Sequence, residues 1–356
     1  MSLVSSRAVG TLWTDRVPNY NSACQAALSC TIMDDRHSRL QTIDGLRGVA
    51  ALAVAFYHVD AGARLSYGDW TPSWLTWLLH QGFLGVDVFF VISGFVIAYS
   101  VRAAIYTPAF LGVFALRRFI RLDPPYWVAI ALEIALIELT LRLGAGNASI
   151  ALPSVQQILA HIVYAQHVLG FGDIIPIFWT LCYEIQFYLF FVGMLVFARS
   201  LRISLHDRVD VRTLGLAALG LLFVTSILAR YDLLWVRIPL WLALNRWFQF
   251  FLGVLVWWVV AQKIRARYLI AAWAFLAAVV AGTGQSPMQV LPIAVSALLW
   301  ISYARDRMAS FLSARPWQFL GAISYSLYLF HSSIGWRVVR APDVLLSSRP
   351  PRWRTG

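Results

Sequence analysis

Residues 82–101 read Gly-Phe-Leu-Gly-Val-Asp-Val-Phe-Phe-Val-Ile-Ser-Gly-Phe-Val-Ile-Ala-Tyr-Ser-Val and contain a single charged side chain, Asp87. A helix needs about 20 mostly apolar residues to cross the hydrocarbon core of a membrane. This stretch therefore predicts a transmembrane helix. A charged group in a membrane costs a few kcal/mol, so Asp87 is expected to have a partner or a function.

The composition of the whole chain agrees with this reading. Of 356 residues, 60% are hydrophobic and 13% are charged, whereas soluble domains are about 45–50% apolar and about 25% charged. These values exclude a disordered chain and disfavour a water-soluble globule. Three cysteines, Cys24, Cys30 and Cys182, lack metal-ligand spacing, so the sequence predicts no metal site and no disulfide framework.

About nine stretches are long and apolar enough to be transmembrane helices, so the predicted fold class is all-α, a polytopic transmembrane helix bundle. The stretches are Ile43–Ala61, Gly82–Val101, Pro124–Leu143, Trp179–Ala198, Thr213–Ala229, Pro239–Val260, Tyr268–Gly282, Met288–Tyr303 and Trp317–Gly335. A further apolar stretch, Leu152–Gly170, contains three Gln and two His residues. We interpret it as an interfacial or re-entrant helix.

Positive charge alternates between the loops that connect these spans. One set of loops holds 17 Arg and Lys residues, and the opposite set, up to residue 335, holds only Arg64, Arg230 and Arg237. Cytoplasmic loops carry the excess of Arg and Lys, so the N-terminus is predicted to be cytoplasmic. The asymmetry accounts for most of the net charge of +12, and no nucleic-acid partner is needed to explain it.

The chain divides into three parts. Residues 1–37 form an N-terminal extension without a proper signal peptide, and Met33 is an alternative start. Residues 38–335 form the transmembrane domain, and residues 336–356 form a basic C-terminal tail. Nine spans place this tail outside the cell, against the charge rule, so we expect a tenth span to be missing there.

Four ionisable residues inside the predicted spans are candidates for acid–base chemistry. They are His58, Asp87, Glu184 and His331. The direction of each span places all four at a similar depth in the outer half of the membrane. Imidazole suits general acid–base catalysis near neutral pH, and a carboxylate can orient an imidazole and stabilise its cation. We expect His58, Glu184 and Asp87 to be catalytic, with His331 as a further candidate.

Arginines mark the opposite, cytoplasmic ends of the same spans. Arg47 begins the first span, and Arg118 and Arg121 share one face if the run before the third span is helical. Guanidinium groups suit a phosphate-bearing ligand. Arg47 and His58 are 11 residues apart, which is about 16 Å along a helix. The pattern suggests a cytoplasmic donor that passes a group to an acceptor on the outer side.

Simpler interpretations of these residues are also open. The arginines are consistent with plain positive-inside anchors, and His58 or His331 with an interfacial hydrogen-bonding residue. Arg246, in the middle of a span, needs a counter-charge, for which Glu184 and Asp87 are both candidates.

Other polar residues have structural readings. Glu138 and Arg142, four residues apart, are interpreted as a helix-stabilising pair. His161 and His167 are interpreted as surface residues. Cys182 is a weak candidate nucleophile, and packing is the favoured interpretation.

Five local patterns resemble the acyltransferase-3 family of integral membrane O-acyltransferases. They occur in the family's order and together cover roughly residues 38–335. The patterns are Ile43–His58, which holds Arg47 and His58 separated by ten residues, Gly85–Phe95, Arg118–Trp127, Phe178–Tyr188 and Phe319–His331.

The resemblance implies transfer of an acyl group, usually acetyl, from acyl-CoA in the cytoplasm to a hydroxyl group. The acceptor would be a sugar of a cell-surface polysaccharide, a glycolipid or a secondary metabolite. His58 would be catalytic with Arg47 beside it, Arg118 and Arg121 would hold the donor, and Glu184 matches the family's acidic position. The protein would lie in the inner (plasma) membrane as a multi-pass protein, and its only cofactor would be acyl-CoA, bound as a substrate.

Two alternatives remain open from the residues alone. The first is a proton-coupled transporter or flippase for a lipid-linked sugar or polymer, because intramembrane His, Asp and Glu residues also form proton relays. The second is a catalytically silent scaffold in a polymer-export complex.

Overall fold

The computed structural model describes residues 40–68, 71–143, 151–204, 211–239 and 241–347. Within these ranges every regular element is a helix, which confirms the all-α prediction. The N-terminal extension, with Cys24 and Cys30, lies outside the described residues.

The helices follow one another along the chain with short connections. They are α2 (Gln41–Tyr67), α3 (Ser73–His80), η1 (Gln81–Leu84), α4 (Gly85–Ser100), α5 (Pro108–Arg142), α6 (Val155–Ile162), α7 (Trp179–Ser204), α8 (Val211–Arg230), η2 (Ala243–Arg246), α9 (Trp247–Val260), α10 (Ala266–Gly282), η3 (Pro287–Val290), α11 (Leu291–Ala304) and α12 (Arg315–Ser347).

Among the described residues, 6 continuous helical stretches are long and apolar enough to cross a membrane, and each corresponds to a predicted span. They are Ser73–Ser100, Pro108–Arg142, Trp179–Ser204, Thr213–Arg230, Ala243–Val260 and Pro287–Ala304. α10 is a shorter apolar helix. The first and ninth predicted spans lie in α2 and α12, which are 27 and 33 residues long but interrupted by polar residues. The total number of spans therefore stays a prediction.

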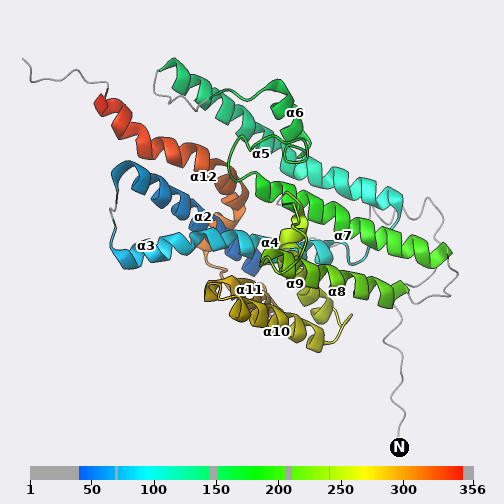
Figure 1. Ribbon diagram of the computed structural model, residues 1–356. Coiled ribbons are helices and arrows are strands. Elements are labelled where there is room, and N and C mark those ends of the chain that lie inside the picture. The colour runs from blue at the N-terminus through cyan, green and yellow to red at the C-terminus, as the bar shows by residue number, and fades with distance from the viewer. Residues whose placement is uncertain (1–39, 69–70, 144–150, 205–210, 240, 348–356) are drawn as a thin grey trace, which may run out of the picture.

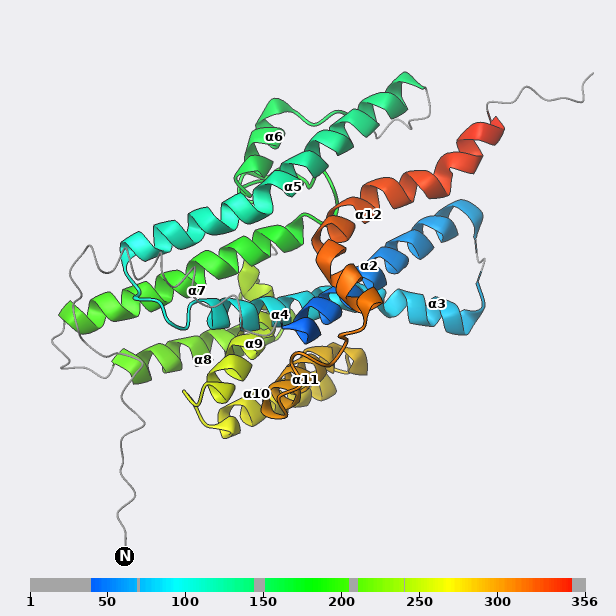
Figure 2. The same cartoon turned by 180° about the vertical axis from the view of Figure 1, so that it is seen from behind.

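α12 packs along α2, as both views of the ribbon show (Figures 1 and 2). Glycines permit this contact. A Cβ atom at Gly48 would lie 2.6 Å from the backbone nitrogen of Gly321, and one at Gly321 would lie 2.3 Å from the carbonyl oxygen of Asp44. Small residues at a crossing let two helix backbones approach closely, which favours association in a membrane. This contact joins residues that lie more than 270 positions apart in the sequence.

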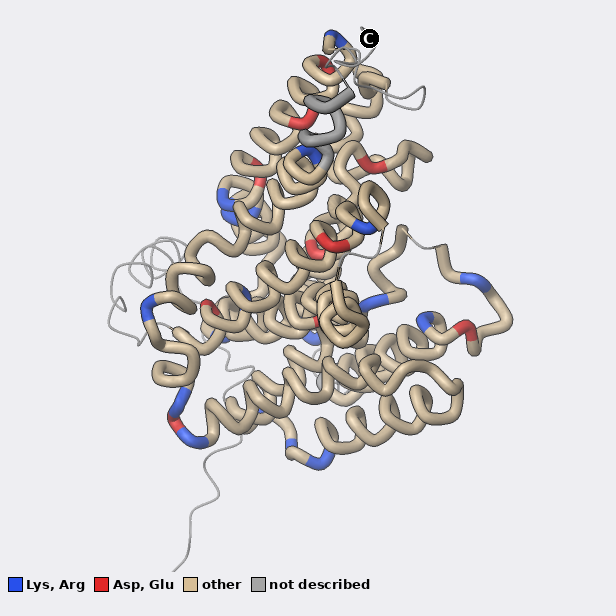
Figure 3. The backbone as a smooth tube through the Cα atoms, turned by 90° about the vertical axis from the view of Figure 1, so that its left-hand side faces the viewer, with Lys and Arg blue, Asp and Glu red and all other residues tan. Residues whose placement is uncertain are grey.

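A second close contact lies between α4 and α9 at the centre of the molecule (Figure 1). Here a Cβ atom at Gly94 would lie 1.8 Å from the carbonyl oxygen of Phe250, and one at Gly253 would lie 2.0 Å from that of Val91. α9 is buried along most of its length. The tube in Figure 3 shows long stretches of uncharged helix with only scattered charged residues. The apolar helices therefore form the core around which the charged groups are placed.

Three regions differ from the expected boundaries. The α5 helix begins at Pro108 instead of Pro124, so Pro124 and Pro125 lie inside it. In the stretch predicted to be interfacial or re-entrant, only the eight residues of α6 form a helix, which at about 12 Å is too short to cross a membrane.

The predicted C-terminal tail also differs. α12 continues without a break to Ser347, so the first part of the assigned tail, residues 336–347, is helical. Arg337 donates from two nitrogens to the carboxylate oxygens of Glu133 on α5, at 3.0 Å each. This ion pair ties the end of α12 to the rest of the bundle. The predicted Glu138–Arg142 pair is confirmed, at 2.7 Å from Oε1 to Nε.

Candidate active site

Two imidazole rings from opposite ends of the chain meet between α2 and α12. Nε2 of His331 lies 3.2 Å from Nδ1 of His58, and the ring centroids are 4.9 Å apart. His331 is only 7% exposed, whereas His58 is half-buried. The close contact of α2 with α12 thus joins two of the four predicted acid–base residues.

Hydrogen bonds determine which nitrogen of each neutral ring carries the proton. Nδ1 of His331 lies 2.8 Å from the carbonyl oxygen of Tyr328, which can only accept, so this nitrogen donates and Nε2 of His331 accepts. Nδ1 of His58 faces that Nε2 and also the carbonyl oxygen of Val54 at 3.0 Å, so it must donate. The remaining nitrogen of His58, Nε2, keeps its lone pair free for a proton.

The two carboxylates have partners other than His58, although we expected one of them to orient its imidazole. Among the described residues, neither Glu184 nor Asp87 hydrogen-bonds His58. Glu184 accepts a hydrogen bond from Ser93 at 2.8 Å and another from Tyr188. The role expected for a carboxylate beside His58 falls geometrically to the neutral imidazole of His331.

A small polar cavity contains Glu184 together with Arg47. Its volume is about 50 Å³, and it is enclosed mainly by α4, α7 and α12. Tyr328 forms part of the wall, and its ring centroid lies 5.7 Å from that of His331. The cavity therefore extends from the guanidinium of Arg47 toward the imidazole pair, with Tyr328 between them.

Arg118 and Arg121 lie at the same end of the site as Arg47. The run that carries them is helical, as predicted. Arg121 is within electrostatic range of Arg118, Arg47 and Glu184, and the guanidinium carbon of Arg118 lies 5.1 Å from the ring centroid of Tyr188. None of the three arginines forms an ion pair within the described ranges. Three guanidinium groups near a single glutamate leave positive charge for an anionic ligand.

Arg246 finds its counter-charge in Asp87. Its NH1 nitrogen lies 3.1 Å from Oδ1 of Asp87, which also accepts a hydrogen bond from Gln249 at 2.8 Å. Of the two candidates from the sequence, the structure thus selects Asp87. The pair lies apart from the imidazoles and is a buried polar cluster of its own.

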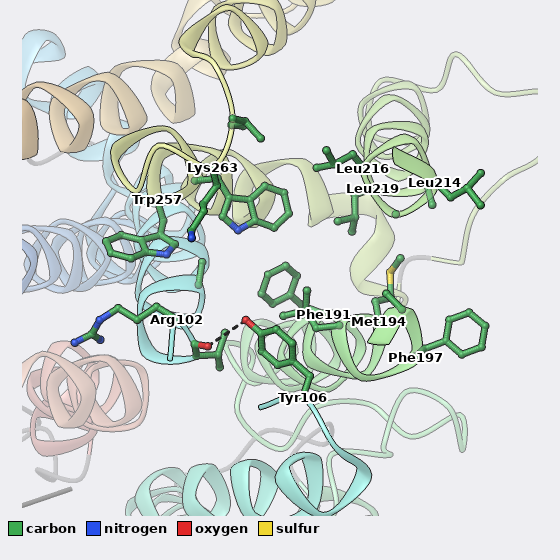
Figure 4. Close-up of a pocket in the computed structure, with 18 of the residues that line it drawn as sticks. Arg102, Tyr106, Phe191, Met194, Phe197, Leu214, Leu216, Leu219, Trp257 and Lys263 are labelled. Carbon is green, nitrogen blue, oxygen red and sulfur yellow. Dashed lines mark hydrogen bonds between the residues drawn. The ribbon is translucent and has the colours of Figure 1, made fainter. Parts of the chain in front are cut away.

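A larger, apolar cavity lies between α4, α7, α8 and α9 (Figure 4). Its volume is about 260 Å³. Apolar residues such as Phe191, Met194 and Leu219 form most of its wall, with Arg102 and Lys263 also on it (Figure 4). This cavity lacks the paired acid and base that acyl transfer needs.

Two structural readings of the sequence are tested near α6. His161 is fully buried rather than on the surface. It accepts a hydrogen bond from the backbone of Ile174 at 3.0 Å, and burial lowers its pKa, because the charged form loses solvation. Cys182 is buried, its sulfur accepts a hydrogen bond from Nε2 of Gln166 at 3.0 Å, and it hydrogen-bonds no base among the described residues. Packing is therefore the structural role of Cys182.

Sequence analysis alone did not single out Ser93, Tyr188 and Tyr328 as site residues. Tyr188 lies four positions after Glu184 and Tyr328 three before His331, spacings that place each pair on one face of a helix. That spacing was the available signal. Ser93 carries no such signal, since its contact with Glu184 depends on how α4 packs against α7.

Comparisons with known proteins identify the family of this chain. A family model described as an acyltransferase domain matches residues 40–338. A protein of Komagataeibacter xylinus named "Putative membrane-bound transacylase BcsY" is 30% identical over 317 residues, which cover 83% of this chain and 72% of that protein. No solved structure matches the chain.

More limited similarity extends to other bacterial proteins. A protein of Staphylococcus aureus (strain COL) named "Putative O-acetyltransferase SACOL0978" is 29% identical over 171 residues, which cover 43% of this chain and 24% of that protein. This chain thus aligns with about a quarter of the staphylococcal protein. The family match, which spans most of the chain and includes the imidazole and guanidinium residues, decides the assignment. The chain belongs to the acyltransferase-3 family and is a multi-pass membrane acyltransferase.

Proposed function

We propose that the protein moves an acyl group, usually acetyl, from acyl-CoA to a hydroxyl group of a sugar. The sugar would belong to a cell-surface polysaccharide, a glycolipid or a secondary metabolite. The observation that carries this proposal is the imidazole pair, with its free lone pair on Nε2 of His58, in the helix α2 that also carries Arg47.

In this mechanism His58 acts as a general base. Its Nε2 accepts the proton of the acceptor hydroxyl while that oxygen attacks the thioester carbonyl. The carbon–sulfur bond then breaks, and the CoA thiolate takes the proton from the imidazolium. His331 accepts a hydrogen bond from Nδ1 of His58 and so stabilises the cation in the intermediate step.

Direct transfer is favoured over a covalent acyl-enzyme. A covalent route through His58 needs a hydroxyl or thiol of the protein within hydrogen-bond reach of its imidazole. The hydroxyls of Ser93 and Tyr188 donate to Glu184 instead. In the described part of the chain, His58 hydrogen-bonds only Val54 and His331, and the thiol of Cys182 accepts a hydrogen bond from Gln166. The attacking oxygen would therefore belong to the acceptor.

The donor's phosphates would bind Arg47, Arg118 and Arg121. Their unpaired guanidinium groups match phosphate oxygens in charge and geometry. The asymmetry of loop charge predicts that this arginine end lies on the cytoplasmic side of the inner membrane, where acyl-CoA is present. The names of the Komagataeibacter and Staphylococcus proteins, a transacylase and an O-acetyltransferase, support the proposal that this protein transfers an acyl group.

The test is acyl transfer from radiolabelled acetyl-CoA in membranes that contain the protein, with label counted in lipid and polysaccharide fractions. We expect His58→Ala to lower transfer by about 10²- to 10⁴-fold, the usual contribution of a general base. His80→Ala is the matched control, because His80 is exposed and its ring lies 5.7 Å from that of Tyr57, the neighbour of His58. Unchanged transfer in His58→Ala at equal protein level would refute the proposal.

A further inference from the structure

A second group of charged residues lies where α8 ends and α9 begins. Arg230 is within electrostatic range of Arg246, Asp87 and the exposed Asp232. Asp87 already has partners, since its Oδ1 accepts hydrogen bonds from Arg246 at 3.1 Å and from Gln249 at 2.8 Å. Arg230, in contrast, forms no ion pair or hydrogen bond with any described residue. Its guanidinium carbon lies 5.8 Å from the ring centroid of Tyr231, so one guanidinium group of the two has an aromatic neighbour but no anionic partner at bonding distance.

Buried polar atoms around Arg230 are also unpaired. Its Nε is shielded from solvent and donates to no described atom. Tyr231 is 7% exposed, and its buried hydroxyl likewise has no hydrogen-bond partner in the described ranges. An unpaired buried donor costs about 1–3 kcal/mol. An external acceptor atom beside these two donors would remove that cost.

Charge indicates which kind of acceptor fits. Two guanidinium groups near one buried carboxylate repel one another, and the surrounding apolar helices strengthen that repulsion. Asp232, which is exposed, offsets this repulsion only in part, because it is within electrostatic range of Arg230 but forms no salt bridge with it in the described chain. The side chain of Arg246 keeps 20% of its surface exposed, so a ligand has access. A carboxylate or phosphate group satisfies both the charge and the donors.

The group is separate from the polar cavity, although the same two helices contribute to both. Val86 and Thr180 line that cavity. Their neighbours in sequence turn the other way: Asp87 binds Arg246, and the ring centroid of Trp179 lies 5.9 Å from the guanidinium carbon of Arg246. α4 and α7 therefore stand between the donor cavity and this cluster.

We propose that Arg230, Arg246 and Tyr231 form a binding site for the carboxylate or phosphate group of an anionic sugar. The anionic group follows from the charges and unpaired donors alone. The sugar rests on the proposed function, in which the acceptor is a carbohydrate.

The test measures binding to the purified full-length protein in detergent, without any acyl donor. Three probes share one sugar framework: D-glucuronate, glucose 1-phosphate and glucose. We expect titration calorimetry to show saturable binding of at least one anionic probe and none of glucose. Arg230→Gln is expected to weaken that binding at least tenfold, since a hydrogen bond to a charged group contributes about 1.5–3 kcal/mol.

Arg237→Gln is the matched control, because Arg237 is an exposed arginine in the segment between α8 and η2. This variant should bind the anionic probe with the affinity of the wild type. Tyr231→Phe removes only the unpaired hydroxyl, and we expect a smaller loss of affinity with an unchanged melting temperature. Preference for glucuronate would identify the ligand group as a carboxylate, and preference for glucose 1-phosphate as a phosphate.

Two results would overturn the proposal: no binding of either anion, or equal affinity in the wild type and in both Arg230→Gln and Tyr231→Phe. The outcome is independent of acyl transfer, because His58→Ala should bind the same probe with unchanged affinity. A failure of the proposed function would therefore appear in the transfer assay and leave this measurement intact.

Discussion

The polar and the apolar cavity in the described part of the chain differ in a way that size does not reveal. Both touch α4 and α7, and the apolar cavity, at about 260 Å³, is far larger than the polar one, at about 50 Å³. Yet Arg47, Glu184 and Ser93 are on the wall of the smaller one. In a membrane, lipid chains fill an apolar space at little cost in free energy. Charged groups on a cavity wall lose solvation, which costs free energy. Arg102 and Lys263 are on the wall of the larger cavity, but the smaller one has both a carboxylate, Glu184, and an arginine, so we take this combination rather than volume as the criterion for the candidate site.

The largest expected difference concerns the arginines of the two cavities. Arg47→Gln should raise the KM for acetyl-CoA by about 10- to 100-fold, because a charge-assisted hydrogen bond to phosphate contributes about 1.5–3 kcal/mol. Arg102→Gln, on the wall of the apolar cavity, should change KM by less than about twofold. Initial rates in membranes across acetyl-CoA concentrations give both values. Equal KM values for the two variants would erase the distinction between the cavities.

A smaller effect is expected at His331, behind the wall of the polar cavity. His331→Leu should lower kcat about tenfold with KM for acetyl-CoA unchanged, since it removes one acceptor, about 1 kcal/mol or slightly more, from Nδ1 of His58. His331→Gln retains an acceptor and should recover part of the rate. Equal kcat values for His331→Gln and His331→Leu, or a rise in KM in place of a fall in kcat, would contradict the positioning role of His331.

The smallest effect is expected in the apolar cavity. Leu219→Trp puts a larger apolar side chain on the wall of this cavity (Figure 4). Acyl transfer should change by less than about twofold, because the larger ring fills apolar space and removes no polar contact. The same assay at equal expression tests this. A loss of transfer as large as that of Arg47→Gln would show that the apolar cavity takes part in the reaction.

Much of the fold could be predicted from hydropathy. The long apolar runs of α4, α7 and α9 specify helices because unpaired backbone groups are intolerable in a hydrocarbon. Boundaries were less predictable. Pro124 suggested the start of a helix, but α5 accommodates it internally. His161 was expected at the surface, and the fold buries its side chain although neighbours such as Leu159 and Val163 are exposed.

The site was predicted residue by residue but not as an arrangement. Sequence chemistry selected His58, His331, Glu184 and Arg47, each an ionisable group in an apolar setting. Position along each helix predicted a common depth for the four acid–base residues, but it did not predict that Glu184 and Asp87 bond other partners than His58. Depth is only one coordinate, and it does not say which face of a helix a side chain occupies.

The sequence by itself determined that this chain is an all-helical membrane protein, and which side chains are too costly to bury without purpose, because both follow from local composition and the price of transfer into lipid. Only the tertiary structure decided the pairings: His58 with His331, Asp87 with Arg246, and Glu184 with Ser93. These pairs join residues 91 to 273 positions apart. They exist because glycines such as Gly48 and Gly94 let particular helices touch, a result of three-dimensional packing that no local pattern specifies.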